Sequence, residues 1–211
     1  RVTEALQGGK IPVVLGGEHS ISLGAVRALK KEYPNLSVLQ LDAHADMRDS
    51  YQGSPYSHAC IARRAREVCP VVQVGIRSMS AEEAAFLKSS PVKSWSVETI
   101  RSGCDWAEAL SRDLSEDVYV TIDLDVFDPS IMPSTGTPEP GGLLWHEVLS
   151  VLREVSRRRC VRGFDVVELA PLPGIVAPDF LAAKLTYRMM GYLAQAVESG
   201  RLDRQRTAAR G

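Results

Sequence analysis

The sequence is poor in the features that mark several large protein classes. Its four cysteines are far apart and form no C-x-x-C pair, so the sequence indicates neither a zinc knuckle nor a disulfide framework. No apolar run approaches a membrane span, and no charged and apolar segments of a secretion signal open the sequence. A formal net charge of -1 gives no basis for binding nucleic acid or a membrane surface. We therefore expect a cytoplasmic protein with neither of these partners.

Length and composition predict one globular domain. A chain of 211 residues with 45% hydrophobic residues is large enough to bury a sizeable core, and we assign residues 1–211 to a single domain. The sequence has no initiator methionine, and Arg1 to Gln7 is typical of the last turns of a helix that stops at Gly8-Gly9. We expect an upstream N-terminal segment to be missing.

Apolar runs alternate along the chain with segments of helical spacing. Strands are predicted at residues 11–15, 36–41, 71–76, 92–96, 118–126 and 161–169, and helices at 20–33, 57–69, from 80 onward, 106–114, 144–157 and 180–197. The strands are continuously apolar rather than alternating, which predicts an α/β fold with a mostly parallel sheet covered on both faces. Residues 201–211 are typical of a frayed basic tail.

The most informative stretch runs from Thr121 to Pro129. An apolar, β-branched run leads into Asp123 and Asp125, and residues two apart on a strand point to the same side. Two carboxylates this close repel each other unless a cation lies between them. An isolated pair of this kind is equally typical of one exposed and one turn-capping aspartate.

Further polar side chains follow the other predicted strands. Asp42, His44 and Asp46 lie two residues apart after the second strand, and His19 follows the first. Ligands of open α/β sheets bind at the carboxyl ends of the strands, so these groups are expected to meet Asp123 and Asp125. Four carboxylates carry about -4, a charge that roughly two divalent ions balance. Nitrogen and oxygen ligands without thiolate favour manganese over zinc, and two such ions indicate a binuclear hydrolase.

Three segments resemble, in order and spacing, the motifs of the ureohydrolases, which are the arginase and agmatinase family: Gly16-Gly17-Glu18-His19-Ser20, Asp42-Ala43-His44-Ala45-Asp46 and Thr121-Ile122-Asp123-Leu124-Asp125-Val126-Phe127-Asp128-Pro129. The resemblance extends from about Lys10 to the terminal helix. It implies a three-layer α/β/α sandwich, two Mn2+ ions per subunit and a homo-oligomer, either a trimer or a hexamer. It also implies one ion held by His19, Asp42, Asp46 and Asp123, and another held by Asp42, His44, Asp123 and Asp125.

The resemblance implies a small guanidino compound as substrate and a hydrolase that acts on linear amidines. A guanidinium keeps its charge and needs a carboxylate partner, and Glu168 stands where the family has that glutamate. His58 resembles the loop histidine that passes a proton to the departing amine, although a structural histidine at a helix start is the alternative. A water shared by the metals would attack the guanidinium carbon and yield urea. Asp165 is expected to serve structure, and His146 packing or the surface.

Agmatine, cleaved to putrescine and urea, is the first choice of substrate. Where arginases carry acids that hold the amino group of arginine, this sequence has Ser78 and Ser80. Guanidinobutyrate or guanidinopropionate is the alternative, because Arg48 offers a cation to a substrate carboxylate. Arginine is a further alternative.

Two other protein classes are alternatives. A binuclear phosphoesterase also begins with D-x-H, but it needs more histidine ligands than the four histidines of this chain supply. An inactive fragment that binds metal or nothing is the second, because the sequence begins without a methionine.

Overall fold

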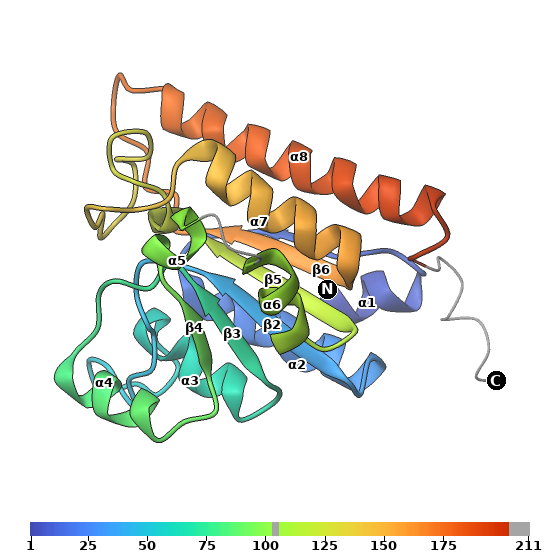
Figure 1. Ribbon diagram of the computed structural model, residues 1–211, viewed down its shortest axis with the longest axis horizontal. Helices are drawn as coiled ribbons and strands as arrows, with labels where there is room; N and C mark the ends of the chain where they lie inside the picture. The colour runs from blue at the N-terminus through green and yellow to red at the C-terminus, as the bar shows by residue number, and fades with distance from the viewer. Residues whose placement is uncertain (103–105, 203–211) are drawn as a thin grey trace.

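A six-stranded, entirely parallel sheet forms the middle of the protein. The computed structural model describes residues 1–102 and 106–202 (Figure 1). The strands are β1 (Val13–Leu15), β2 (Leu36–Leu41), β3 (Val71–Val74), β4 (Lys93–Trp95), β5 (Asp117–Asp123) and β6 (Cys160–Val167). Their order across the sheet is β1-β6-β5-β2-β3-β4. The predicted α/β class and the parallel sheet are confirmed.

The strand order places a switch point in the centre of the sheet. From β2 the chain continues through β3 to β4 at one edge, and β5 then returns to the other side of β2. β2 and β5 pair in register from Leu36 with Asp117 to Leu41 with Ile122. Crossovers that leave in opposite directions open a crevice beyond the carboxyl ends of such neighbours. The segments after Leu41 and after Ile122 therefore meet in that crevice.

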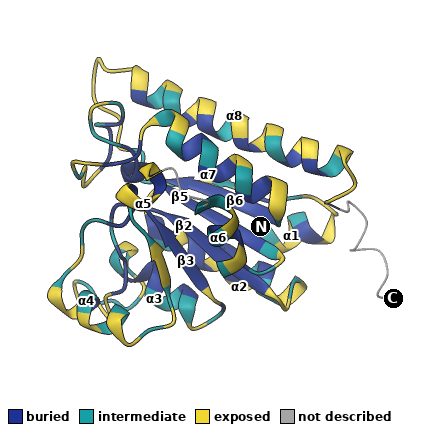
Figure 2. Ribbon diagram, in the orientation of Figure 1, coloured by how far each residue is buried: buried dark blue, intermediate teal, exposed yellow. Residues whose placement is uncertain are grey.

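Helices cover both faces of the sheet and complete three layers. One face carries α5 (Val97–Arg101), α6 (Trp106–Asp113), α7 (Trp145–Arg158) and α8 (Ala177–Glu198), and the other carries α1 (Val2–Gln7), α2 (Ser22–Glu32) and α3 (Ile61–Arg66). A short helix, α4 (Ala81–Lys88), packs beside the sheet over a small separate core (Figure 1). The four inner strands β2, β3, β5 and β6 are buried between the helical layers, while the helices expose one side (Figure 2).

Local sequence determines where several helices begin. Ser80 accepts a hydrogen bond from the main chain of Glu83, and Glu83 accepts one from the main chain of Ser80, which is a capping box at the start of α4. This confirms the helix start predicted there. α8 carries Pro178 in its first turn, where a missing N–H costs nothing, and therefore begins at Ala177 rather than at the predicted residue 180.

The first strand differs from its prediction. β1 spans only Val13–Leu15 instead of residues 11–15, and Val13 and Leu15 are 38% and 68% exposed. β1 lies at an edge of the sheet with β6 as its one partner, so it has fewer neighbours to cover it than a central strand has. The prediction that this strand is buried was therefore wrong, although a strand does form there.

Other boundaries also differ. The strand predicted to run to residue 126 ends at Asp123, and a 3-10 turn (η3, Leu124–Val126) follows. The helix predicted at 57–69 divides into a 3-10 turn (η2, His58–Cys60) and α3, which ends at Arg66. Helix α5 was not predicted. Cys104 and most of the predicted basic tail, residues 203–211, lie outside the described residues.

Among the described helices, none combines the length and the apolar character that a membrane crossing requires.

Candidate metal centre

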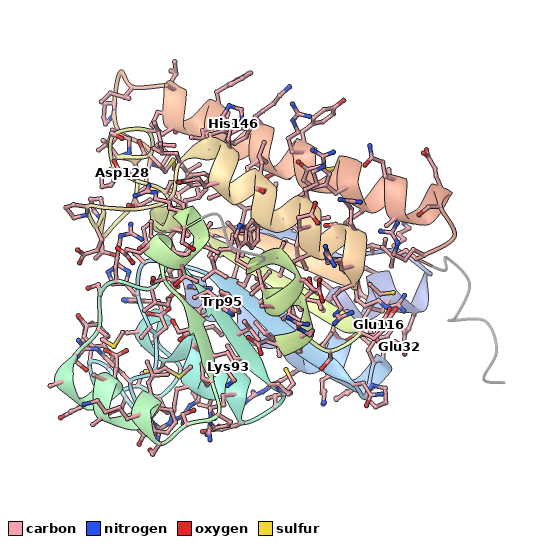
Figure 3. The ribbon with its side chains drawn as sticks, in the orientation of Figure 1. Glu32, Lys93, Trp95, Glu116, Asp128 and His146 are labelled. Carbon is pink, nitrogen blue, oxygen red and sulfur yellow. The ribbon has the colours of Figure 1, made fainter. Side chains whose placement is uncertain are left out.

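The polar residues singled out in the sequence gather at the carboxyl ends of the central strands. Asp42 directly follows β2, Asp123 ends β5, and His19 opens the 3-10 turn (η1, His19–Ile21) after β1. Figure 3 shows Asp128 at the end of the molecule where these loops lie, and Glu32 and Glu116 at the opposite end. The convergence expected from the strand-end positions is therefore present.

Three carboxylates surround one nitrogen of His19. The distances from His19 Nδ1 are 3.2 Å to Asp42 Oδ2, 3.3 Å to Asp46 Oδ2 and 3.3 Å to Asp123 Oδ2. His19 and Asp42 are fully buried, and the side chains of Asp46 and Asp123 are at most 9% exposed. Ligand atoms of His19, Asp42 and Asp123 lie close enough to hold one ion.

A second group shares Asp42 with the first. Asp125 Oδ2 lies 2.8 Å and Asp42 Oδ1 lies 3.6 Å from His44 Nδ1. Asp42 thus directs one oxygen to each histidine, and its ligand atoms with those of His44 and Asp125 are arranged to hold a second ion. Asp123 belongs to the first of these groups, and its other oxygen accepts the main-chain N–H of Asp125 at 2.9 Å.

The side chains converge by a different local structure from the one predicted. Asp42, His44 and Asp46 do not alternate along a strand, because β2 ends at Leu41 and the chain then turns, with Asp46 at a positive φ of 51°. Asp125 lies in a 3-10 turn rather than on β5. A non-glycine residue at positive φ costs about 1 kcal/mol or more and persists where the surroundings impose it. Spacing by two thus singled out side chains that the structure does bring together, although the local geometry differs from the predicted strand.

Main-chain and amide groups hold the carboxylates in place. Asp42 accepts hydrogen bonds from Gln40 Nε2 at 2.7 Å and from the N–H of His44 at 2.6 Å. Asp125 Oδ1 accepts the N–H of Ala43 at 3.0 Å, which ties the loop after β2 to the loop after β5. Each carboxylate keeps an oxygen directed at a histidine, so these bonds orient the ligands without consuming them.

The electrostatics of the centre favour positive charge. Burial and the neighbouring charge of Asp42 raise the pKa of Asp46 to about 8, and the same two causes raise the pKa of Asp123. Burial opposes charge on His44, but its contacts with Asp125 and Asp42 outweigh this and raise its pKa to about 11. The pKa of His19 also rises against the effect of burial, through Asp123, Asp42 and Asp46. Buried carboxylates at this density require protons or cations beside them.

The donor set fits divalent ions. His19 Nδ1 is buried and has no hydrogen-bond partner of acceptable geometry, although three carboxylate oxygens face it. The two groups offer imidazole nitrogen and carboxylate oxygen and no thiolate, which suits manganese. In the described part of the chain these are the two clusters with that character.

A cavity of about 480 Å³ lies over the centre. Five of the six proposed ligands line it, all except Asp42, and so do His58 and Glu168. Glu168 adopts a positive φ of 64°, its Oε1 accepts the N–H of His19 at 2.6 Å, and burial raises its pKa. His58 starts η2, is about half exposed, and its Nδ1 lies 3.5 Å from Glu18 Oε2. His146 is exposed on the outer helical layer (Figure 3).

Two cavity residues were not singled out by the sequence. Glu83 is 4% exposed, and its carboxylate accepts the N–H groups of Met47 at 2.8 Å and of Ser80 at 2.7 Å. The capping-box pattern marked Glu83 only as the start of a helix, whereas it also lines the cavity between Arg48 and Ser80. Glu18 also lines the cavity, and its position beside His19 was the available signal.

Fold and site together define an α/β protein with a buried centre of carboxylates and imidazoles at the switch point of a parallel sheet. The arginase family profile matches residues 1–191. An N(1)-aminopropylagmatine ureohydrolase of Synechocystis sp. is 40% identical over 90% of this chain and 63% of its own length. An agmatinase of Pyrococcus horikoshii is 41% identical over 88% of this chain and 64% of its length.

Solved structures agree. The agmatine ureohydrolase of Thermoplasma volcanium superposes with a TM-score of 0.82 at 36% identity, covering 94% of this chain and 67% of that one. The chain belongs to the arginase family. It spans a little under two thirds of the length of these two curated relatives.

Proposed function

We propose that the protein is a binuclear manganese hydrolase that releases urea from a small guanidino compound, with agmatine as the first-choice substrate and putrescine as the second product. The observation that carries the proposal is Asp42, whose two oxygens face His19 and His44 separately. A carboxylate shared in this way is suited to bridge two cations. The family relationship and the similarity to agmatinases support the same activity.

Six residues would hold the ions, namely His19, Asp42, His44, Asp46, Asp123 and Asp125. Two bound divalent ions supply a water of lowered pKa, which is nucleophilic near neutral pH. The side chains of the cavity would carry out the other steps of the reaction. These side chains must orient the planar guanidinium, exclude competing water and return a proton to the departing amine.

Glu168 would bind the guanidinium. Its main-chain strain and its bond to the His19 N–H fix the carboxylate at the cavity wall, and burial raises its pKa without removing its ability to accept hydrogen bonds from a cation. His58 would supply the proton, because its ring lines the cavity and its Nδ1 lies 3.5 Å from Glu18 Oε2. Its exposure at the cavity mouth gives it access to bulk water.

The far part of the cavity favours an amine at the other end of the substrate. Ser78 and Ser80 line it, as the sequence comparison with arginases predicts, and Glu83 adds a buried carboxylate. Arg48, the cation that would suit guanidinobutyrate, instead stacks on Tyr51 at 5.1 Å and lies 3.8 Å from Glu83. Acidic and hydroxyl groups in this region support a substrate that ends in an ammonium group.

A longer substrate is the second candidate. The Synechocystis relative is named for N(1)-aminopropylagmatine, which is agmatine extended by an aminopropyl arm. A cavity of about 480 Å³ leaves room beyond agmatine, and its acidic lining suits a second ammonium group.

One panel tests these assignments. Urea release is measured with manganese and with agmatine, N(1)-aminopropylagmatine, arginine, guanidinobutyrate and guanidinopropionate. We expect the two amines to be cleaved fastest, and arginine as the preferred substrate would overturn our interpretation of Ser78 and Ser80. Asp123→Asn should abolish urea release, whereas Asp49→Asn, at a residue 77% exposed on its side chain, should retain it. Full activity of Asp123→Asn would refute the binuclear centre.

Assembly, location and domain organisation complete the proposal. We infer a homo-trimer or homo-hexamer in the cytoplasm, with residues 1–211 as one catalytic domain. Light scattering with and without manganese tests the assembly. Monomeric material that neither binds manganese nor releases urea would instead favour the inactive fragment.

A further inference from the structure

A line of hydrogen bonds leads from His19 away from the cavity and into the sheet. The Nε2 atom of His19 lies 2.8 Å from the hydroxyl of Thr121, on β5. That hydroxyl lies 2.7 Å from Oδ1 of Asp165, on the adjacent strand β6. The sheet register places Thr121 directly opposite Asp165, so the contact is built into the pairing of two strands. His19 and Asp165 are fully buried and Thr121 is 3% exposed.

The protons along this line can be assigned from hydrogen-bond chemistry. Asp165 receives donors on both oxygens, the Ile122 N–H at 3.3 Å on Oδ1 and the Tyr119 hydroxyl at 2.6 Å on Oδ2. A carboxylate only accepts, so Thr121 gives its single proton to Asp165. The Thr121 oxygen then has lone pairs left and must accept from His19. Nε2 of His19 therefore carries a proton, and in the neutral ring Nδ1 has a free lone pair.

The competing partner of Thr121 is weaker. The Ser22 hydroxyl lies 3.3 Å from the Thr121 hydroxyl, a longer contact between neutral groups. The bond to Asp165 is shorter and assisted by charge, so it takes the Thr121 proton. Ser22 is then free to donate to the remaining lone pair of Thr121.

We propose that Thr121 and Asp165 are positioning residues that hold His19 in the tautomer and orientation in which Nδ1 faces Asp42, Asp46 and Asp123. This nitrogen is buried and has no hydrogen-bond partner of acceptable geometry, and the three carboxylate oxygens lie 3.2–3.3 Å from it. The proposal rests on the metal centre of the proposed function. It adds that the sheet itself, through Thr121 and Asp165, prepares a cation ligand before any ion arrives.

Manganese affinity measured by titration calorimetry on the whole chain tests the role of Thr121. Thr121→Val keeps the shape of the side chain and removes the hydroxyl, and we expect the affinity to fall about 10- to 100-fold, the effect typical of an outer-sphere partner of a histidine ligand. Thr121→Ser restores the hydroxyl and should restore the affinity. Ser22→Ala removes the weaker contact alone and should bind as the unaltered protein does.

The same titrations separate two kinds of failure. Tight binding by both the unaltered protein and Thr121→Val would overturn the positioning role and leave the metal centre standing. No binding by the folded, unaltered protein would overturn both. An equal loss in Ser22→Ala and Thr121→Val would assign the effect to packing and overturn the relay.

A measurement of the tautomer needs no variant. In the zinc-loaded protein, which is diamagnetic, nitrogen-15 spectra of the His19 ring should show a proton on Nε2 and the ion on Nδ1. The opposite assignment would overturn the proposal even if Thr121→Val fails to fold. In Asp165→Asn the amide oxygen can take the place of Oδ1 and accept from Thr121 and from the Ile122 N–H, while the amide nitrogen faces the Tyr119 hydroxyl oxygen. We therefore expect this variant to keep the proton on Nε2 and to bind manganese more tightly than Thr121→Val.

Discussion

The guanidinium of Arg77 donates a hydrogen bond of 2.7 Å to the main-chain carbonyl of Asp125. The same side chain reaches the carbonyl oxygens of Gly75, Val126, Phe127, Glu139 and Pro140 at 2.7–3.5 Å. One planar cation thus joins the end of β3, the turn that carries Asp125 and the loop before α7. Arg77 contacts main-chain oxygens rather than a carboxylate partner, so its role in this network is geometric.

Arg77→Lys should loosen this junction. A lysine ammonium has three donors on a flexible stem and cannot reproduce the fork of a guanidinium. Partly buried carbonyls left without donors cost about 1–3 kcal/mol each. We expect a loss of at least about 2 kcal/mol in the free energy of unfolding and weaker manganese binding, measured by urea denaturation and titration calorimetry. Arg112→Lys, in an exposed pair on α6, is the control and should change stability by less than about 0.5 kcal/mol. Equal effects of the two changes would contradict the assignment.

The ion pair of Arg101 and Glu147 predicts a pH dependence of stability. Two hydrogen bonds of 2.7 and 3.1 Å join the side chains, and Glu147 also accepts the N–H of Leu144 at 2.7 Å. Arg101 chiefly lowers the pKa of Glu147, so the folded protein favours the ionised form. The stabilisation is therefore complete above the unfolded pKa of about 4.3 and is lost as the pH falls through the lower folded pKa.

Glu147→Gln keeps an oxygen that can accept the main-chain N–H of Leu144 and removes the negative charge that pairs with Arg101. Because Arg101 is 44% exposed, we expect a loss of at most about 1 kcal/mol at pH 7, shrinking to zero below the folded pKa. Thermal unfolding of both proteins, recorded between pH 3 and pH 7 at intervals of about half a pH unit, measures this loss of stability. Glu108→Gln, in the exposed pair with Arg112, serves as the control and should show a smaller effect. A loss that grows toward acid pH would have the wrong sign.

Asp123→Asn should separate the stability of the fold from that of the metal centre. The change replaces one of four crowded carboxylates by a neutral group of the same shape, so the melting temperature without metal should not fall. The rise in melting temperature on adding manganese should disappear, since ligand stabilisation follows affinity and reaches about 2.7 kcal/mol at 100 times the dissociation constant. Differential scanning calorimetry with and without manganese measures both quantities. A manganese-dependent rise equal to that of the unaltered protein would contradict the role of Asp123.

Much of the fold follows from the sequence because buried strands carry a strong local pattern. Leu36–Leu41 is apolar enough and bounded well enough that its limits coincide with the prediction. Burial of β1 could not be predicted, because it depends on how many neighbours the strand has in the finished sheet. Helix α5, with five residues, is too short to show a helical period.

The candidate site was predictable in its membership and not in its geometry. Motifs and strand ends singled out six side chains, and the structure brings all six together, since the carboxyl ends of parallel strands converge whatever the loops do. The positive φ of Asp46 and of Glu168 left no mark in the sequence, because neither is a glycine. The hydrogen bond between His19 and Thr121, and its continuation to Asp165, could not be predicted from the sequence either. Thr121 and Asp165 lie 44 positions apart and meet only through the register of β5 and β6.

The last prediction compares two glycines, one with no room for a side chain and one with open space around it. A Cβ on Gly142 would lie 2.5 Å from the main-chain N of Asp128 and from the carbonyl carbon of Phe127, so the loop beside Asp125 would have to move. Gly142→Ala should therefore lower the free energy of unfolding by about 2 kcal/mol or more, as overpacking against rigid backbone does, and should weaken manganese binding. On helix α2, a Cβ on Gly24 meets nothing within 4 Å, and Gly24→Ala should raise stability by about 0.5–1 kcal/mol through helix propensity. Chemical denaturation of both variants compares them directly. If Gly142→Ala proved as stable as Gly24→Ala, the close approach of the loop at residue 142 to the turn after Asp125 would not exist in solution.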